Sequence, residues 1–518
     1  MKKSFVKTFS TVFIITLISK VLGLLRDIVF AKYYGTGYIA TAYFAAIRIP
    51  TQLLDIGLSA AITSTFIPVF NEILQKDGRD NANKFAGNFI NIIAAIATII
   101  SVIGIIFSEQ VVTLLAGGFE TQTFNLTVDL IKITFPMIIF TAIAFSFVGF
   151  LQSYGQFNIP AMISAISNLA LIIYLVLFRE NFGIYGVTTF MLIAWALQVL
   201  IQLPSAYKNG YRFKFKIDFK DENIKKVFKL AIPIIFSTSV LSVNNLVATR
   251  LASNMGDSAV AALEYSYKLY LVIVGVFSYA IGNIIFPELA RSSVEKDNTK
   301  YIDIIQKGVR ILSYLLIPLT IGIMIYKTDL VSVIYQSGEF NENSTLLTSG
   351  ALLFYSIGML GFGIVEVMNK AFYAKKDAKT PMLIGIVVII VNVALSFGLS
   401  RIMQFNGLAL STAITSTLNA IILLICANYK EKGIINKGLI INLFKILISA
   451  GVMCVVVILI NNGLINIING NKLMQIIRVG IGALVGVMIY YLSTLLLKVD
   501  EALIPVDYIK NRKNTVNE

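Results

Sequence analysis

Long apolar stretches of about twenty residues recur along the whole chain, and they limit what it can fold into. A helix needs about 20 mostly apolar residues to cross a bilayer. Charged residues make up only 14% of the chain, against about 25% in soluble domains, which excludes a water-soluble enzyme and a disordered chain. We predict an all-α, polytopic membrane protein with fourteen transmembrane helices. They lie near residues 9–31, 38–72, 85–112, 127–152, 158–178, 184–206, 227–252, 258–288, 306–326, 345–374, 380–400, 406–428, 439–462 and 474–497.

Lys and Arg residues fall mainly in every second loop, and this asymmetry predicts the orientation of the chain. Cytoplasmic loops of membrane proteins are enriched in these two residues. The connection 207–226 alone contains Lys208, Arg212, Lys214, Lys216, Lys220, Lys225 and Lys226. Because the number of spans is even, we expect both termini in the cytoplasm. These loops also account for most of the net charge of +15, so the sequence does not require a nucleic-acid partner.

The two halves of the chain share motifs at an offset of about 220 residues, which indicates an internal duplication. Phe-Ile-Pro at 66–68 closes the second span, and Ile-Phe-Pro at 285–287 closes the eighth. Residues 117–120 recur loosely as 337–340. Each copy holds six spans, so the copies share one orientation, as in transporters with two lobes around a midplane site. The predicted parts are an N-lobe (1–206), a cytoplasmic linker (207–226), a C-lobe (227–428), and two further helices with a cytoplasmic tail (429–518).

Ionisable side chains inside the apolar stretches are the candidate functional residues. They are Lys20, Arg26 and Asp27 in the first span, Arg48 and Asp55 in the second, and Glu264 and Lys268 in the eighth. A charge at mid-bilayer costs about 3 kcal/mol on insertion scales, so such residues usually face an internal cavity. At a rise of about 1.5 Å per residue, Arg48 and Lys268 lie at similar depths, about 15 and 16 Å into their helices. The excess of cations predicts a site for an anion, and arginine suits phosphate through paired hydrogen bonds.

The alternative is that these charges neutralise each other along one helix or extend to the membrane surface. Glu264 and Lys268 are four residues apart with the acid first, which is a favourable spacing for an ion pair. Glu366 and Lys370 in the tenth span have the same spacing, and we interpret this second pair as self-neutralised. Trp195, within the sixth span, is interpreted as a packing residue.

Several kinds of chemistry have no support in the sequence. The chain has no histidine, and Cys426 and Cys454 both lie in apolar stretches, so we expect neither a metal site nor a disulfide. No phosphate-binding loop with a Gly-Lys-Ser/Thr ending occurs, which argues against an ATPase. Paired carboxylates with the spacing of a hydrolase are also missing. We therefore expect a protein that is not an enzyme and has no cofactor.

Residues 19–27, Ser-Lys-Val-Leu-Gly-Leu-Leu-Arg-Asp, resemble the Ser-Arg-Val-Leu-Gly-x-x-Arg-Asp signature of the MurJ (MviN) family of lipid II flippases. This family is part of the multidrug/oligosaccharidyl-lipid/polysaccharide exporter superfamily. The stretches 66–68, 133–136 and 156–161 extend the resemblance, which is looser in the second half. It implies two six-helix lobes around a cationic cavity for the substrate diphosphate. It also implies a groove for the lipid tail at spans thirteen and fourteen.

The resemblance also assigns roles to single residues. Arg26 and Asp27 match the functional Arg-Asp pair of the family. Lys20 stands where the family usually has arginine, and Arg48 stands at a basic position before a proline. Lys268 takes the place of an essential arginine in the eighth span. The chain departs from the family pattern at Ala42, Leu54 and Ser59, so at least one cavity arginine is missing.

We therefore expect a flippase that moves lipid II, an undecaprenyl-diphosphate-linked peptidoglycan precursor, from the inner to the outer leaflet of the bacterial cytoplasmic membrane by alternating access. Lys20, Arg26, Arg48 and Lys268 would bind the diphosphate, and Asp27 would orient Arg26. Asp55 and Glu264 are accessory candidates. The expected partners are the lipid-linked glycan and membrane lipids. We expect a monomer, and the family resemblance permits a coupled ion. The alternatives are an exporter of another polyprenyl-linked glycan (capsule, teichoic or O-antigen type), a cation-coupled drug exporter, which the basic excess disfavours, and a membrane enzyme.

Overall fold

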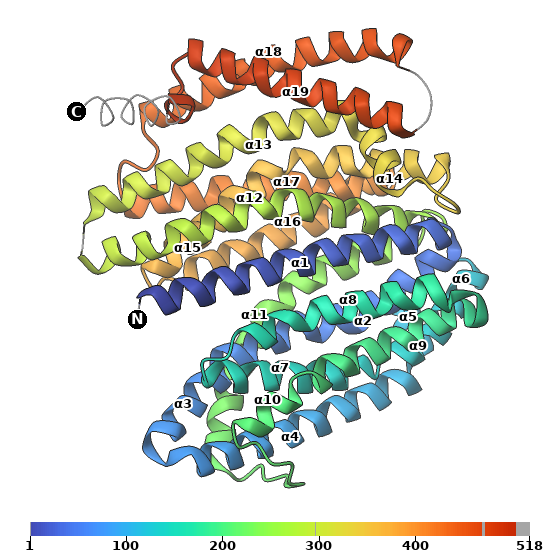
Figure 1. The fold of residues 1–518 in the computed structure, drawn as a ribbon, viewed down its shortest axis with the longest axis vertical. Coiled ribbons are helices and arrows are strands. Elements are labelled where there is room, and N and C mark those ends of the chain that lie inside the picture. Colours follow the sequence, from blue (N-terminus) through green and yellow to red (C-terminus); the bar gives the residue numbers. More distant parts are fainter. Residues whose placement is uncertain (1, 296, 469–471, 504–518) are drawn as a thin grey trace. The chain divides into compact units, whose positions relative to one another are not determined.

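The structure, a computed structural model, describes residues 2–295, 297–468 and 472–503, and these contain helices and short connections but no β-strand (Figure 1). Contacts divide the chain into two compact units. The first comprises residues 1–261 and 337–340, and the second comprises 262–336 and 341–518.

Within the described residues, twelve helical segments build the first unit, and its most extensive packing joins Lys2–Tyr34 to Asn158–Leu177. The segments are α1 (Lys2–Tyr34), α2 (Tyr38–Ala61), the π-helical η1 (Ile62–Phe66), α3 (Ile67–Lys76), α4 (Gly78–Ile106), α5 (Ser108–Ala116), α6 (Thr121–Thr134), α7 (Met137–Ser153), α8 (Asn158–Leu177), α9 (Arg179–Leu200), α10 (Leu203–Lys208) and α11 (Glu222–Ala252).

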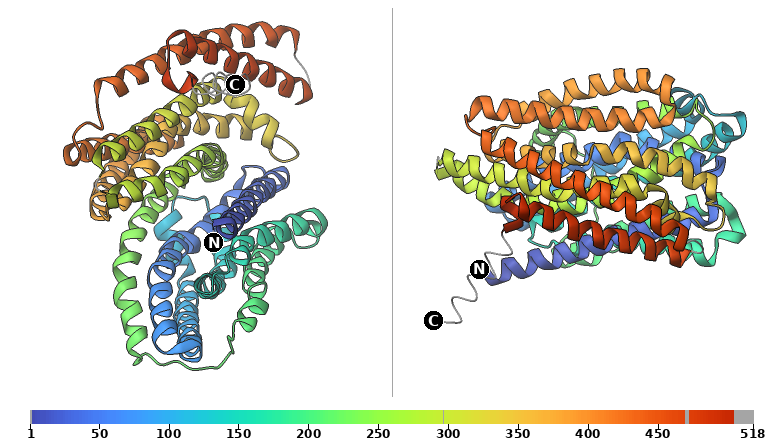
Figure 2. Two further views of the ribbon diagram at one scale, coloured as in Figure 1. Left: turned by 60° about the vertical axis from the view of Figure 1, so that its left-hand side comes forward. Right: turned by 90° about the horizontal axis from the view of Figure 1, so that it is seen from above.

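The described part of the second unit contains eight helices, of which α18 and α19 run side by side and α13 packs against both (Figure 1 and Figure 2). They are α12 (Ala259–Glu295), α13 (Asn298–Tyr335), α14 (Glu342–Ile357), α15 (Met359–Ala374), α16 (Lys379–Met403), α17 (Phe405–Lys430), α18 (Lys437–Ile467) and α19 (Lys472–Leu496). The two units are defined by contacts between residues, whereas the predicted lobes are defined by the sequence repeat. The lobe boundaries therefore stay a prediction.

The helices coincide with the predicted spans. Within the described residues, ten helical segments are long and apolar enough to cross a membrane, and α14 with α15 forms an eleventh that bends by 46°. The remaining three predicted spans coincide with α1, α2 and α11, part of whose side chains lie outside the described residues. The prediction of an all-α polytopic membrane protein is confirmed, and the helices are consistent with fourteen spans.

Pro50 lies inside α2, and the neighbouring helix compensates for the hydrogen bond that it removes. A proline has no N–H to donate to the carbonyl four residues earlier, which here belongs to Ala46. The Thr134 hydroxyl of α6 donates to this carbonyl instead, at 2.8 Å. Because Ala46 and Thr134 are both fully buried, the carbonyl would otherwise lack a partner in an apolar surrounding.

Two glycines hold the loop 337–340 against the turn between α1 and α2. Gly35 and Gly338 have φ values of +55° and +57°, which favour glycine. A Cβ on Gly35 would lie 2.4 Å from the Glu339 carbonyl oxygen, and one on Gly338 would lie 2.3 Å from the Lys32 carbonyl oxygen. The Glu339 N–H donates to the same Lys32 oxygen at 2.9 Å. The loop and the turn therefore meet through their backbones, and the lack of a side chain at each glycine makes this close approach possible.

We expect Gly35→Ala to destabilise the protein more than Gly155→Ala does. Both glycines have positive φ, which costs about 1–3 kcal/mol for other residues. Only Gly35 faces a backbone atom, because a Cβ on Gly155 would have no neighbour within 4 Å. The apparent unfolding temperature in detergent measures the two losses. Equal losses would show that the loop 337–340 is not held against this turn.

Candidate functional site

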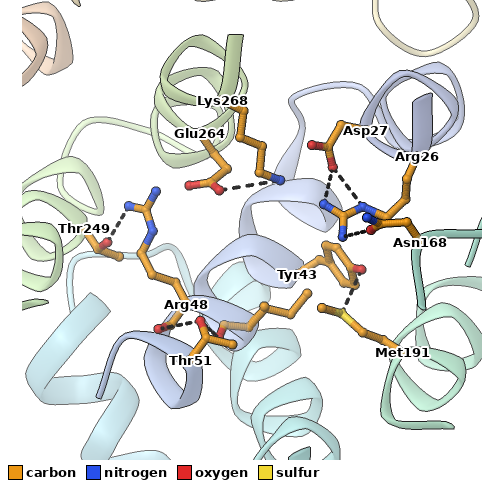
Figure 3. Close-up of polar contacts among 11 residues, drawn as sticks. Arg26, Asp27, Tyr43, Arg48, Thr51, Asn168, Met191, Thr249, Glu264 and Lys268 are labelled. Carbon is orange, nitrogen blue, oxygen red and sulfur yellow. Dashed lines mark hydrogen bonds and ion pairs between the residues drawn. The ribbon is translucent and has the colours of Figure 1, made fainter. Parts of the chain in front are cut away.

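Arg26 of α1 is the centre of a polar cluster in the first unit (Figure 3). Its Nε and Nη2 donate to Asp27 Oδ1 at 3.1 and 2.8 Å, and its Nη1 donates to Asn168 Oδ1 of α8 at 3.0 Å. Asp27 and Asn168 are buried, with 6% and 7% of their surfaces exposed, so both partners of the guanidinium are fixed in the protein. The predicted Arg26–Asp27 interaction is thus present, and the cluster fixes the orientation of the guanidinium.

The sequence of α1 explains how α8 comes so close. Ser19, Gly23 and Arg26 are spaced four and three residues apart and therefore share one face of the helix. A Cβ on Gly23 would lie 3.3 Å from Asn168 Nδ2, so glycine lets the two helices approach. Asn168 Nδ2 in turn donates to the Ser19 carbonyl at 3.3 Å. The amide of Asn168 therefore joins the backbone of α1 to the guanidinium of Arg26.

A cavity of about 480 Å³ adjoins this cluster within the first unit. Lys20 and Arg26 line it from α1, as the interpretation of these residues as cavity cations requires. Beyond α1, the rest of the lining comes from Phe145 of α7 and from α8 and α9. The lining residues also include Ser164, Ser167, Asn168, Trp195 and Gln198.

The hydroxyl and amide residues among them were missed in the sequence, where the only polar side chains considered inside the spans were ionisable ones. The signal that could have identified them is a set of hydroxyl and amide residues on one face of α8, at 164, 167 and 168. A further amide lies at 198 on α9. Gln198 Nε2 donates to Ser167 Oγ at 3.1 Å, so the two helices are joined across the cavity wall.

Arg48 of α2 also belongs to the first unit but contacts a different helix. Its Nη1 donates to Thr249 Oγ1 of α11 at 2.9 Å, and Thr249 is buried (Figure 3). Thr249 Oγ1 donates to the Asn245 carbonyl at 2.9 Å, so the acceptor is itself oriented. The side chain of Asp55 lies outside the described residues, and its accessory role stays a prediction.

Glu264 and Lys268 belong to the second unit and form the ion pair that their spacing predicts. The Nζ–Oε1 distance is 3.5 Å, and 23% of the Lys268 side chain and 16% of the Glu264 side chain are exposed (Figure 3). Glu366 and Lys370 of α15 pair in the same way at 3.6 Å. The pairing predicted for both sets of residues is present, and the role of Lys268 in binding an anion stays a prediction.

The second unit also contains an apolar cavity of about 470 Å³ between α12, α13, α18 and α19. Phe277, Pro318, Met453, Val487 and Tyr490 are among its lining residues. The resemblance implies a groove for a lipid tail at α18 and α19, which form part of this lining, and that role stays a prediction. Among the described side chains, no group of three or more acidic, histidine or cysteine residues could hold a metal ion.

One ion pair that the sequence did not reveal lies beside this cavity. Arg478 of α19 pairs with Asp329 of α13, and only 10% and 17% of the two side chains are exposed. Next to it, Ser332 Oγ donates to Gln475 Oε1 at 3.0 Å. These contacts fix α19 to α13, and both helices line the apolar cavity.

The fold is that of a polytopic transporter of helical lobes. A solved inward-facing structure of a multidrug resistance MATE family transporter of the MOP superfamily aligns with a TM-score of 0.68 at 13% identity, over 81% of this chain and 98% of that one. A solved structure of the lipid II flippase MurJ in an inward closed conformation aligns with a TM-score of 0.80 at 26% identity, over 94% of this chain and 99% of that one.

The sequence comparisons narrow this class to one family. The model of the lipid II flippase MurJ family matches residues 30–477. A probable lipid II flippase MurJ of Haemophilus influenzae is 31% identical over 428 residues, which cover 79% of this chain and 83% of that protein. The lipid II flippase MurJ of Burkholderia cenocepacia is 27% identical over 427 residues, or 81% and 82% of the two chains. This chain belongs to the MurJ family of lipid II flippases.

Proposed function

We propose that this protein is a flippase that moves lipid II from the inner to the outer leaflet of the bacterial cytoplasmic membrane by alternating access. The observation that carries the proposal is the match of the MurJ family model to residues 30–477. Transport requires no covalent step, so the protein has to bind the headgroup, shield it from the hydrocarbon and release it. We place both termini in the cytoplasm, on the distribution of Lys and Arg among the loops.

Lys20, Arg26, Arg48 and Lys268 bind the diphosphate in this proposal. Charge-assisted hydrogen bonds to phosphate are about twice as strong as neutral ones, and a guanidinium can make two in parallel. Asp27 acts as a positioning residue, because its carboxylate accepts two hydrogen bonds from Arg26. Lys20 supports the same site, because it lines one cavity with Arg26.

The membrane potential supplies enough free energy for the proposed direction of transport. Moving one elementary charge across a membrane is worth about 2.3 kcal/mol per 100 mV, so moving a dianion to the outer side of an inside-negative membrane is favourable by about 4–5 kcal/mol per 100 mV. This holds if no charge of the protein moves with the substrate. The cycle then needs no ATP, and we propose that the protein acts as a monomer.

The test is complementation. We expect the unmutated gene to restore growth and rod or coccal shape to a strain depleted of its own lipid II flippase, and the empty vector not to do so. If the protein reaches the membrane without restoring growth, while it restores export of a capsule or teichoic precursor in a strain lacking that exporter, the substrate is another polyprenyl-linked glycan.

A further inference from the structure

The geometry points to a subsite for a sugar ring in the polar cavity of the first unit, beside the cations that bind the diphosphate. In this subsite Trp195 stacks on the ring, and the amides and hydroxyls of α8 and α9 bind its polar groups. The inference rests on the proposed function, because it concerns the part of the headgroup that is joined to the diphosphate.

Both cations that line the cavity come from one helix, and the rest of the lining is neutral. Lys20 and Arg26 lie on α1, whereas the residues contributed by α8 and α9 are neutral. No acidic residue is among the described residues that line the cavity, which disfavours a cation as the ligand. A ligand that is anionic at one end and has neutral hydroxyl and amide groups at the other fits this arrangement. A sugar diphosphate has that character.

The neutral polar side chains of the cavity are held in fixed positions by hydrogen bonds. Ser167, Asn168 and Gln198 are buried, with 3%, 7% and 8% of their surfaces exposed, and each makes a hydrogen bond that fixes it. Polar side chains inside membrane helices are costly unless they have partners. Hydrogen bonds between the helices explain why some of these polar residues occur inside the membrane spans. They do not explain why the residues border a cavity of about 480 Å³, which lies within the range of about 300–1,000 Å³ typical of ligand sites.

Trp195 adds an aromatic surface to the same cavity. It is partly exposed, and it shares the wall formed by α9 with Gln198, three residues further on. A tryptophan that only anchored the helix at the membrane surface would face lipid headgroups, as the aromatic belts of membrane proteins do. Here the side chain borders the space next to Lys20 and Arg26. Trp195 thus has a surface available to a ligand besides the packing role that the sequence predicts.

The chain offers a direct probe, because Trp195 is its one tryptophan. In the full-length protein in nanodiscs, we expect lipid II to change the tryptophan emission as it binds. Undecaprenyl diphosphate, which has no sugar, should bind as measured by native mass spectrometry and leave the emission unchanged. This experiment needs no substitution, so it does not depend on how a variant folds. The same emission change with both lipids, or with neither, would overturn the subsite.

A second measurement compares affinities. We expect Trp195→Ala to weaken binding of lipid II about tenfold and to leave binding of undecaprenyl diphosphate unchanged, while Trp195→Phe retains most of the affinity. The control is Phe190→Ala, which removes an aromatic ring from the same helix; Phe190 stacks on Tyr174 at 4.6 Å and is not a lining residue. An equal loss for both lipids would indicate a structural role and contradict the subsite.

The outcomes separate this inference from the proposed function. If the unsubstituted protein transports lipid II and Trp195→Ala binds it with unchanged affinity, the subsite is wrong and the flippase proposal stands. If the unsubstituted protein binds neither lipid, the proposed function fails, and the subsite fails with it.

Discussion

Removal of the Arg26 charge is expected to abolish lipid II transport. A charge-assisted hydrogen bond contributes about 1.5–3 kcal/mol. The loss of two such bonds between the guanidinium and a phosphate group would therefore lower transport by a factor of about a hundred or more. Arg26→Lys should retain part of the activity, because an ammonium keeps the charge but lacks the planar pair of donors. Headgroup transport in reconstituted vesicles and complementation of a flippase-depleted strain both measure the effect.

Two controls distinguish a lost phosphate ligand from a damaged fold. Arg26→Ala removes the guanidinium that pairs with the buried Asp27 carboxylate, and deleting one partner of a buried ion pair is itself destabilising. Arg26→Ala combined with Asp27→Asn removes that penalty, so its unfolding temperature should recover while transport stays absent. Lys370→Ala, which removes a half-buried cation from an ion pair on α15, should complement normally. Full complementation by Arg26→Ala, at normal protein levels, would refute the assignment of a cationic site.

Removal of Arg478 is expected to have the largest effect on stability. Breaking a buried ion pair by deleting one partner costs about 3–5 kcal/mol, because the other charge stays buried and unpaired. Here Arg478→Ala would leave Asp329, whose side chain is 17% exposed, between α13 and α19. We expect a clear decrease in the apparent unfolding temperature and a loosening of α19, which limited proteolysis would detect.

A double substitution of the same pair tests whether the unpaired buried charge causes the loss of stability. Replacing both partners by apolar residues of similar size, as in Arg478→Met with Asp329→Leu, should restore most of the stability, since such replacements of buried pairs are often neutral or stabilising. Lys307→Ala is the exposed control. Its ion pair with Asp303 lies at the surface, and pairs of that kind contribute about 0.2–1 kcal/mol. If Arg478→Ala and Lys307→Ala unfold at the same temperature, burial of the Arg478–Asp329 pair has no energetic role.

Much of the fold could be predicted because a membrane imposes length and polarity on each helix. The apolar stretches coincide with the helices, and the spacing of four residues correctly paired Glu264 with Lys268 and Glu366 with Lys370. Both results rest on local geometry, which the order of residues determines.

Contacts between distant segments could not be predicted in this way. The partner of Arg26 on α8, the partner of Arg48 on α11 and the partner of Arg478 on α13 are each more than a hundred residues away in the sequence. The carbonyl that Pro50 leaves without a donor could be identified from the sequence, but the Thr134 hydroxyl that bonds to it could not.

The order of residues by itself determined that this chain is a helical membrane protein with cations inside its spans, and the signature at 19–27 indicated its family. The tertiary structure alone decided that Lys20 and Arg26 share a cavity with Trp195 and neutral polar residues of α8 and α9. The physical reason is that hydropathy and helical spacing depend on near neighbours in the chain. Which faces of separate helices meet depends on the packing of side chains from all of them.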